Sequence, residues 1–333
     1  MVPFSMKHRL WLAAGAVLGS AMLTPYACLA QSGFPNKVIT LVSAFPTGGT
    51  TDIVARAIAP PLGQALGVSV IVENRVGAAG MLATDHVAKA KPDGYTLLVT
   101  TATTVLILPH TSDTVLPYDA QKDLVGITLM GIAPEVLAVN PKVPATNLKE
   151  LIALAGKRQV TLASSGTGGL PHLVIELLRS SASGARIVHV PFKGAGPAVI
   201  DTLGGHVDGI FVDLPAVATQ IKANQLRGIT VANNRRSEFL PDLQTSVEQG
   251  FPNVIGVNWT GILAPAGTPR PVIDKLHAAL LNMLKLDAVK KALALSSVEV
   301  SVSATPADFA KFLAVEYKKW AKVVEDAGMK PTR

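Results

Sequence analysis

Residues 45–56 read FPTGGTTDIVAR and come directly after an apolar run, VITLVSA, at residues 38–44. Apolar runs rich in β-branched residues are typical of strands, and a helical pattern begins in the quoted stretch and continues over residues 52–66. The sequence therefore predicts a strand, a glycine-rich loop and a helix, in that order. The same unit recurs along the chain, and it decides the fold class.

The glycine-rich loop of this first unit has two interpretations. Thr50 or Thr51 is the expected N-cap of the helix, and Asp52 lies in its first turn. Gly48 and Gly49 either form an ordinary turn or bring backbone N–H groups to an anion at the positive end of the helix dipole. Under the second interpretation, a valine at Gly49 would occupy the anion's space and oppose a positive φ. These residues alone leave both interpretations open.

Two further loops are similar to the first. In TLASSGTGGLPHLVIELL, residues 161–178, Pro171 opens the helix, and Ser165 and Thr167 add hydroxyl donors to the loop. This stretch lacks the lysine of a P-loop and the third glycine of a dinucleotide fingerprint. VPFKGAGPAVI, residues 190–200, again follows a strand pattern. Three such loops favour a ligand held beyond the strand ends.

Short apolar runs alternate with helical patterns over most of the chain. The expected strands are KVITLV, VSVIVE, YTLLVT, EVLAVN, QVTLAS, RIVHVPF, DGIFVD and LRGITVA. The expected helices between them include residues 52–66, 147–155 and 215–223. Apolar strands separated by helices are typical of parallel sheets covered on both faces, an α/β architecture. So many strands exceed one domain of ordinary size, so we expect two domains.

The C-terminal third is expected to be helical, over residues 271–284, 287–294 and 306–327. Pro271 and Pro306 suit the first turn of a helix, where the missing N–H costs nothing. The last of these helices carries an apolar face that we expect to pack on a domain, formed by Phe309, Phe312, Leu313, Tyr317 and Trp320.

The first thirty residues have the pattern of a secretory signal peptide. Lys7 and Arg9 precede an apolar stretch, LWLAAGAVLGSAML, and CLA ends in a small residue before Gln31. Cleavage after Ala30 would leave an exported chain without cysteine. The alternative is a lipoprotein anchored at Cys28, which the preceding residues, PYA, disfavour.

The remaining charge is modest and scattered. Without the leader, 28 basic residues face 23 acidic ones, a net charge of +5, and the longest basic runs are NNRR and KK. A nucleic-acid partner is therefore not expected, and a mild attraction for anions is all that the charge supports. No later run of about eighteen apolar residues indicates insertion into a membrane.

No motif points to catalysis, a metal or a cofactor. The sequence has no G-x-S-x-G elbow, no H-E-x-x-H pair and no cysteine nucleophile outside the leader. The histidines are spread singly, and among them His172 stands out because it follows the second glycine-rich loop. The others outside the leader are His86, His110, His189, His206 and His277. Asp213 ends the strand DGIFVD and either caps the next helix or faces a ligand.

Several motifs together resemble one family. The chain reads FPTGGTTDIVAR, VENRVGAAG, PDGYTLL, LPYD, HVPFKG, LGGHVD and GILAPAGTP, in that order, and these motifs run from about Phe34 to the C-terminus. In this the chain is similar to the Bug/TctC family, the periplasmic solute receptors of tripartite tricarboxylate transporters. The resemblance implies a two-domain Venus-flytrap fold, similar to type II periplasmic binding proteins, with a mostly parallel sheet in each domain and a ligand cleft between them.

The resemblance also implies domain limits and a site. Domain 1 would comprise residues 31–137 and 260–333, and domain 2 residues 138–259. The first loop would hold one carboxylate of a small organic anion, partly through ordered water, and residues 164–169 would close over its other end. The implied ligand-binding residues are Phe45, Thr47, Gly48, Gly49, Asp52, Thr101, Ser165, Gly166, Thr167, Gly168, Gly169, His172, Phe192, Lys193, Gly194 and Asp213.

The function implied is capture of a carboxylate, without chemical conversion, by a monomeric receptor that delivers it to the membrane subunits of the transporter. The alternatives are a receptor that feeds a sensor kinase of a two-component system and, in another class, a secreted α/β hydrolase. The chain departs from the usual family pattern at Met81, Val105 and Leu108, where relatives often have polar residues. If these side chains face the ligand, its body should be apolar or aromatic.

Overall fold

The structure is a computed structural model that describes residues 33–329. The elements below belong to one compact unit, Pro35–Arg333, and the signal-peptide prediction lies outside the described residues. The strands are β1 (Ile39–Ser43), β2 (Val70–Asn74), β3 (Thr96–Thr101), β4 (Leu124–Val139), β5 (Val160–Ser164), β6 (Ile187–Pro191), β7 (Gly209–Asp213), β8 (Arg227–Val231), β9 (Val257–Pro265) and β10 (Glu299–Val300).

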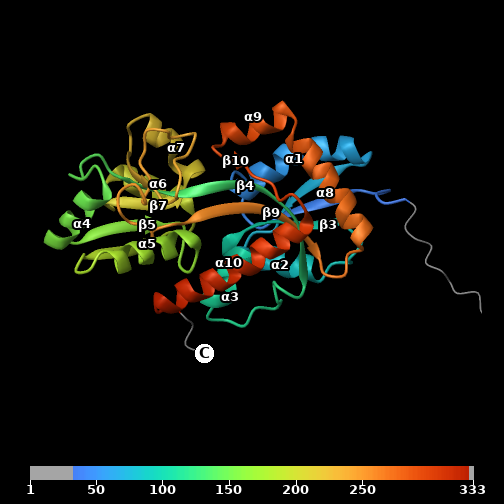
Figure 1. Cartoon of the computed structure of the whole chain (residues 1–333), viewed down its shortest axis with the longest axis horizontal. Helices are drawn as coiled ribbons and strands as arrows, with labels where there is room; N and C mark the ends of the chain where they lie inside the picture. Colours follow the sequence, from blue (N-terminus) through green and yellow to red (C-terminus); the bar gives the residue numbers. More distant parts are fainter. Residues whose placement is uncertain (1–32, 330–333) are drawn as a thin grey trace, which may run out of the picture. The chain divides into compact units, whose positions relative to one another are not determined.

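Helices separate these strands over most of the chain (Figure 1). They are α1 (Thr50–Leu66), α2 (Met81–Ala88), α3 (Leu108–Thr111), α4 (Leu148–Lys157), α5 (Leu170–Ser181), α6 (Ala195–Gly204), α7 (Leu214–Lys222), α8 (Arg270–Leu284), α9 (Asp287–Leu295) and α10 (Pro306–Asp326), together with a short 3-10 helix η1 (Ala78–Gly80) and a π-helix η2 (Thr103–Ile107). Every strand and helix range expected from the sequence is occupied by an element of that type.

The strands are ordered β2-β1-β3-β9-β4-β7-β5-β6, and β8 and β10 also pair with β4. The ladders β1–β2, β1–β3, β5–β6 and β5–β7 are parallel, as expected for strands separated by crossover helices. The ladders made by β4 and β9 are antiparallel. The sheet is therefore mixed, and the expectation of mostly parallel pairing holds only away from β4 and β9.

The sheet has two parts, one that contains β1, β2 and β3 and one that contains β5, β6, β7 and β8, and strand β4 belongs to both. Its first half pairs with β9, which in turn pairs with β3, and its second half pairs with β7 and β8. The sequence indicated only the second half, EVLAVN, and gave no strand at β9. Gly126, Gly131 and Pro134 interrupt the apolar pattern of β4, and the ladder to β9 shifts register near both glycines.

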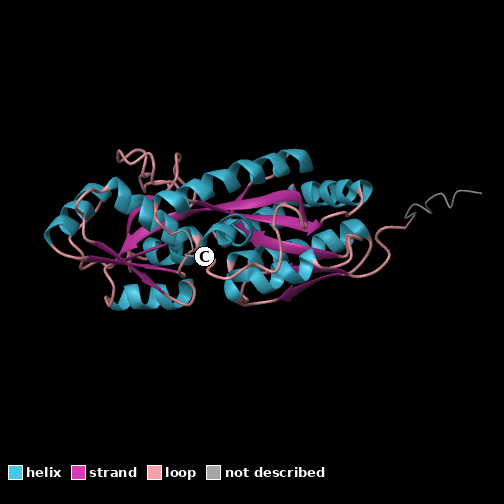
Figure 2. Ribbon diagram, turned by 90° about the horizontal axis from the view of Figure 1, so that it is seen from below, coloured by secondary structure: helices cyan, strands magenta, loops and turns pink. Residues whose placement is uncertain are grey.

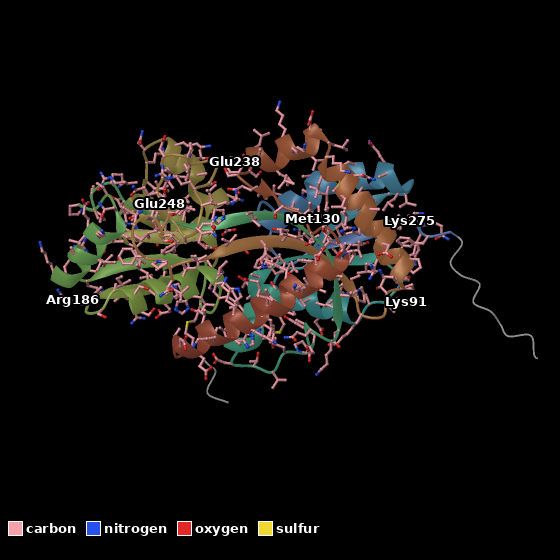
Figure 3. The ribbon with its side chains drawn as sticks, viewed as in Figure 1. Lys91, Met130, Arg186, Glu238, Glu248 and Lys275 are labelled. Atoms are coloured by element: carbon pink, nitrogen blue, oxygen red, sulfur yellow. The ribbon has the colours of Figure 1, made fainter. Side chains whose placement is uncertain are left out.

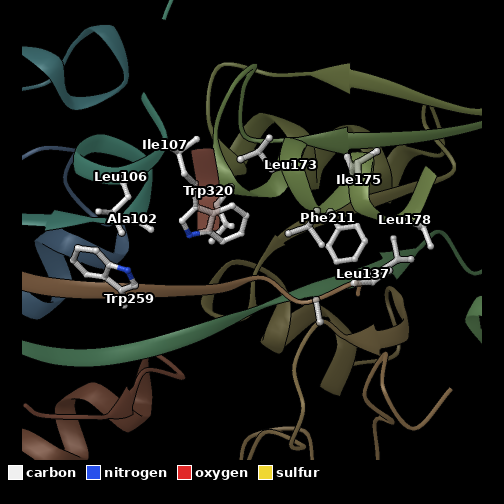
Figure 4. Packing of buried hydrophobic residues seen from close by; sticks show 14 of the residues in the cluster. Ala102, Leu106, Ile107, Leu137, Leu173, Ile175, Leu178, Phe211, Trp259 and Trp320 are labelled. Carbon is white, nitrogen blue, oxygen red and sulfur yellow. The ribbon is translucent and has the colours of Figure 1, made fainter. Parts of the chain in front are cut away.

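Helices cover both faces of the strands (Figure 2). Along β4, Val136 and Ala138 belong to a core cluster with residues of α6 and α7, whereas Leu137 and Val139 belong to another with residues of α5. Successive side chains of a strand point to opposite faces, so EVLAVN is apolar throughout because both faces are covered. Figure 4 shows Leu137 and Phe211 packed beside Leu173 and Ile175 in the second of these clusters.

The C-terminal helix α10 packs on the sheet, as its apolar face predicts. Phe309 and Trp320 are fully buried, and Phe309 packs against Gly126 of β4 and Gly261 of β9, where a Cβ would collide with its ring. Pro306 lies in the first turn, and the side chain of Thr305 caps the helix by accepting a hydrogen bond from the N–H of Asp308. The close contact requires glycine in both strands.

Charged side chains lie on many different elements. Figure 3 shows Lys275 on α8, Arg186 before β6, and Glu238 and Glu248 after β8. Most ion pairs among the described residues are local, such as that of Arg270 with Asp274 one helical turn away. Such exposed pairs contribute little to stability.

Candidate ligand-binding site

Four helices begin at the loops that follow parallel strands: α1 after β1, α5 after β5, α6 after β6 and α7 after β7. Their N-cap residues are Gly49, Gly169, Gly194 and Asp213, and none of these four N-cap residues makes a capping hydrogen bond through its side chain. The first N–H groups of a helix have no partner within it, and the helix dipole favours an anion there. These helix starts are the candidate anion-binding positions of the fold.

The first loop is organised by Asp52. Its buried carboxylate accepts hydrogen bonds from the N–H of Gly48 at 3.0 Å, Nε of Arg56 at 3.1 Å and Nδ2 of Asn74 at 2.9 Å. Burial raises the pKa of this carboxyl, but the hydrogen bonds outweigh burial and hold the pKa below its usual range. Both carboxylate oxygens have partners inside the chain, so Asp52 shapes the loop.

The start of α1 differs from the expectation at two points. Its N-cap is Gly49, whose carbonyl accepts the first helical hydrogen bond from Ile53, so that Thr50 and Thr51 are already helical and the N-cap prediction was wrong. The positive φ belongs to Gly48, at +84°, whereas Gly49 has φ −75°. A Cβ on Gly48 would meet no atom within 4 Å.

The loops after β5 and β6 lie against each other. The N–H of Gly194 donates to the carbonyl of Ser165 at 3.2 Å, and the N–H of Phe192 donates to that of Ser164 at 3.0 Å. Gly166 has φ +149° and Gly194 has φ +109°, conformations that favour glycine. The two loops therefore form one surface.

Asp213 links the start of α1 to the end of β7. Its Oδ2 accepts hydrogen bonds from Thr50 Oγ1 at 3.0 Å and from Asn258 Nδ2 at 3.3 Å. Although Asp213 occupies the N-cap position of α7, its side chain makes no capping bond. Of the two roles that the sequence left open, the structure excludes capping of the helix.

A second link joins η2 and α3 to the loop after β5. Thr111 Oγ1 donates to the carbonyl of Gly168 at 3.1 Å, and the N–H of Leu170 donates to Thr103 Oγ1 at 3.4 Å. Sequence reasoning missed Thr103, Thr111 and Asn258. The only signal for the first two was a group of threonines after a predicted strand.

The predicted site residues fall into several groups. Those of the first loop are Phe45, Thr47, Gly48, Gly49 and Asp52; those of the two adjoining loops are Ser165, Gly166, Thr167, Gly168, Gly169, Phe192, Lys193 and Gly194; Thr101 ends β3, Asp213 ends β7 and His172 lies in the first turn of α5. Phe192 packs partly buried on the core beside α6 and α7. Thr101 is almost fully buried, and Thr47, Thr167 and Lys193 are exposed.

The departures from the family pattern lie mainly in the core. Val105 belongs to η2 and is 2% exposed within the same buried cluster as Leu137, and Leu108 is 9% exposed. Met81 is half-buried at the start of α2. The expectation of an apolar ligand body depended on Val105 facing the ligand, and Val105 packs in the core instead.

His172 and His189 stack beneath the loop after β5, with ring centroids 3.7 Å apart. Nδ1 of His172 accepts the N–H of Gly168 at 3.1 Å, and Nε2 of His189 lies 2.6 Å from Ser164 Oγ. Burial and then the neighbouring His172 lower the pKa of His189 to about 4. His189 is therefore neutral in the folded protein near pH 7.

Acid is expected to destabilise the protein through His189. Between pH 6.5 and about 4, the unfolded chain binds a proton at His189 that the folded chain refuses, so this contribution to stability is complete above pH 6.5 and is lost as the pH falls. Urea unfolding of His189→Gln over this range should show a weaker loss than the wild type. Equal slopes for His189→Gln and the wild type would contradict this assignment.

Other sites are not supported within residues 33–329. No group of three or more His, Cys, Asp or Glu side chains is placed to hold a metal ion there, and no helix in that range is long and apolar enough to cross a membrane. A cavity of about 170 Å³ lies where β4 ends and β7 begins, whereas Asp213 lies at the other end of β7. Lys142, Arg158 and Asp208 are among its lining residues, and Arg158 is already paired with Asp208.

This α/β architecture, with β4 shared between two parts of a mixed sheet, is that of the two-domain periplasmic binding proteins. A solved structure described as a periplasmic transporter is 38% identical, with a TM-score of 0.81, over 90% of this chain and 99% of that chain. A protein from R. palustris, solved with adipate, is 30% identical with a TM-score of 0.83, over 90% of this chain and 100% of that one.

The chain belongs to the TctC family: the model of the tripartite tricarboxylate transporter family receptor matches residues 54–329. Protein BugT from Bordetella pertussis is 36% identical over 319 residues, covering 95% of this chain and 97% of BugT. MatC from Rhodopseudomonas palustris, solved with bound malate, is 30% identical with a TM-score of 0.78, over 87% of this chain and 100% of MatC. This family is one of transporter receptors, and the chain is accordingly a solute-binding receptor and not an enzyme.

Proposed function

We propose that this receptor captures a small organic carboxylate in the periplasm and delivers it to the membrane subunits of a tripartite tricarboxylate transporter. The observation that carries the proposal is the set of four helix starts, at α1, α5, α6 and α7, whose N-cap residues make no capping bond through a side chain. One carboxylate of the ligand would accept hydrogen bonds from the N–H groups at the start of α1, and a second would contact the loops after β5 and β6.

The links between the two parts of the sheet support this placement. Thr50 donates a hydrogen bond to Asp213, and Thr111 donates one to Gly168 in the loop after β5, so both parts supply residues beside the proposed site. A ligand that contacts both parts stabilises the arrangement in which they meet, by population shift. Adipate and malate, with which two of the similar structures were solved, are both dicarboxylates. An apolar body is not part of the proposal, because Val105 is buried in the core.

The organisation and location of the protein complete the proposal. Domain 1 would comprise residues 31–137 and 260–333, and domain 2 residues 138–259, with the crossings in β4 and β9. The mature receptor would begin at Gln31, after cleavage at Ala30, and act as a monomer. A measured mass of the intact protein that corresponds to a chain beginning at an acylated Cys28 would contradict cleavage after Ala30.

Ligand-induced stabilisation tests the binding function. Residues 31–333 should gain about 2.7 kcal/mol in the free energy of unfolding when the right dicarboxylate is present at about a hundred times its dissociation constant. A thermal-shift panel of succinate, malate, adipate and citrate, each beside its uncharged amide, provides the measurement. The diacid should stabilise and its amide should not, because the amide removes the negative charge that the helix starts favour.

Two results would overturn the proposal. One is a panel in which no carboxylate raises the unfolding temperature more than its amide. The other is chemical conversion of the stabilising compound during incubation with the protein, detected by mass spectrometry. A receptor releases its ligand unchanged.

A further inference from the structure

Glu135 is a buried acid without a partner. It lies in β4 with 0% of its surface exposed, and neither carboxyl oxygen has a hydrogen-bond partner among the described residues. Its backbone is satisfied, because its N–H donates to Gly256 at 2.9 Å and its carbonyl accepts from Ala232 at 2.8 Å. Buried polar groups in native proteins are nearly always paired, so this side chain requires an explanation.

A second buried glutamate shows what pairing looks like in this protein. Glu299 is 4% exposed, and its two oxygens accept hydrogen bonds from Arg235 Nη2 at 2.7 Å and Ser237 Oγ at 2.9 Å. Among the described residues, no such cation and no such hydroxyl is hydrogen-bonded to the carboxyl group of Glu135.

Glu135 lies beside the proposed ligand site. In the ladder between β4 and β7 it stands directly opposite Asp213, and side chains at directly opposite positions share one face with Cβ atoms about 4.5–5.5 Å apart. A Cβ on Gly256 would collide with Val174 of α5 and would lie 3.2 Å from Glu135 Cγ, so the side chain of Glu135 packs beside a glycine and close to α5. Asp213 in turn bonds to Thr50, in the first turn of α1.

The two acids have no positive charge to balance them. Asp213 accepts hydrogen bonds from Thr50 and Asn258, both neutral, and neither acid forms an ion pair with a Lys, Arg or His of residues 33–329. Two carboxylates that face each other in a sheet repel, and a buried unpaired charge is costly. Burial, and then the charge of Asp213, raise the pKa of Glu135 well above its usual range.

An ammonium group on the ligand matches these acids. It supplies the missing positive charge and three N–H donors, which suit two carboxyl groups on one face of a sheet. We propose that Glu135 and Asp213 form a subsite for a protonated amine, so that the ligand is an amino carboxylate. This inference rests on the proposed function, because the carboxylates of the same ligand occupy the helix starts.

Matched pairs of ligands test the inference. L-aspartate and succinate differ only in the amino group, as do L-glutamate and glutarate. Calorimetric titration of residues 31–333 should show that, in at least one pair, the amino compound binds at least about tenfold more tightly than the compound without the amino group. In Glu135→Gln, which keeps the shape but cannot become negative, this preference should fall by about tenfold.

Glu299→Gln is the matched control. It neutralises an equally buried glutamate that is already paired, so the preference for the amino compound should equal that of the wild type. Thermal unfolding without ligand checks that each variant is folded, and Glu135→Gln should be no less stable than the wild type because it removes an unpaired acid.

The outcomes separate this inference from the proposed function. Tight binding of succinate or glutarate with no preference for the amino compound would overturn the ammonium subsite and leave the carboxylate receptor intact. A preference that survives in Glu135→Gln would also overturn it, because a neutral side chain would then suffice. A wild-type protein that binds neither these nor any other carboxylate would overturn the proposed function itself.

Discussion

Gly48→Val is expected to abolish stabilisation by carboxylates, whereas Gly67→Val is expected to preserve it. Gly48 has φ +84° at the start of α1, and a Cβ there meets no protein atom within 4 Å, so an added side chain projects into open space at the proposed site. Gly67 has φ +71° at the far end of the same helix, and its Cβ direction is equally open. The two variants therefore introduce similar backbone strain, but at opposite ends of α1.

The size of the effect follows from that comparison. A side chain in the left-handed conformation costs roughly 1–2 kcal/mol, so both variants should lose similar stability without ligand. With ligand at about a hundred times the wild-type dissociation constant, Gly67→Val should gain about 2.7 kcal/mol and Gly48→Val nearly nothing. Thermal unfolding with and without the ligand measures both quantities. If Gly48→Val folds and gains as much as Gly67→Val, the first loop is only a turn.

Phe309→Ala is expected to lower the free energy of unfolding by about 3–5 kcal/mol, the usual cost of truncating a buried phenylalanine. The ring is fully buried against Gly126 and Gly261, and it meets Trp259 edge-on with centroids 5.8 Å apart. Alanine would leave a cavity between α10 and two strands whose glycines cannot fill it. Urea denaturation measures the change.

Val315→Ala is the control on the same helix. Val315 is 59% exposed, so its truncation should change the free energy of unfolding by no more than about 0.5 kcal/mol. A loss below about 1 kcal/mol for Phe309→Ala would show that α10 does not depend on this contact.

The repeating strand–loop–helix units could be predicted because their strands are apolar on both faces and their loops contain glycine. The first half of β4 could not be predicted, since Gly126, Gly131 and Pro134 break its apolar pattern and the ladder to β9 shifts register there. Strand β9 could not be predicted either, because Asn258, Thr260 and Gly261 interrupt its own apolar pattern. These two strands carry the chain from one part of the sheet to the other. The glycines that hide the first half of β4 in the sequence lie where its ladder to β9 shifts register.

The glycine-rich loops of the site could be predicted from their composition, and the residues that join them could not. Thr50 and Asp213 are 163 positions apart, and only the order of the strands brings them together. The apolar pattern of EVLAVN likewise gives no sign that its first residue, Glu135, is buried without a partner. Its environment depends on Asp213 and Gly256, which come from other elements.

The most direct test of the receptor mechanism is a crystal structure of residues 31–333 with the carboxylate that stabilises them most. The predicted result is a carboxylate oxygen that accepts a hydrogen bond of about 2.7–3.2 Å from a backbone N–H in the first turn of α1 or α5. A ligand bound instead in the cavity beside Lys142 and Arg158, with both helix starts left to solvent, would contradict the account.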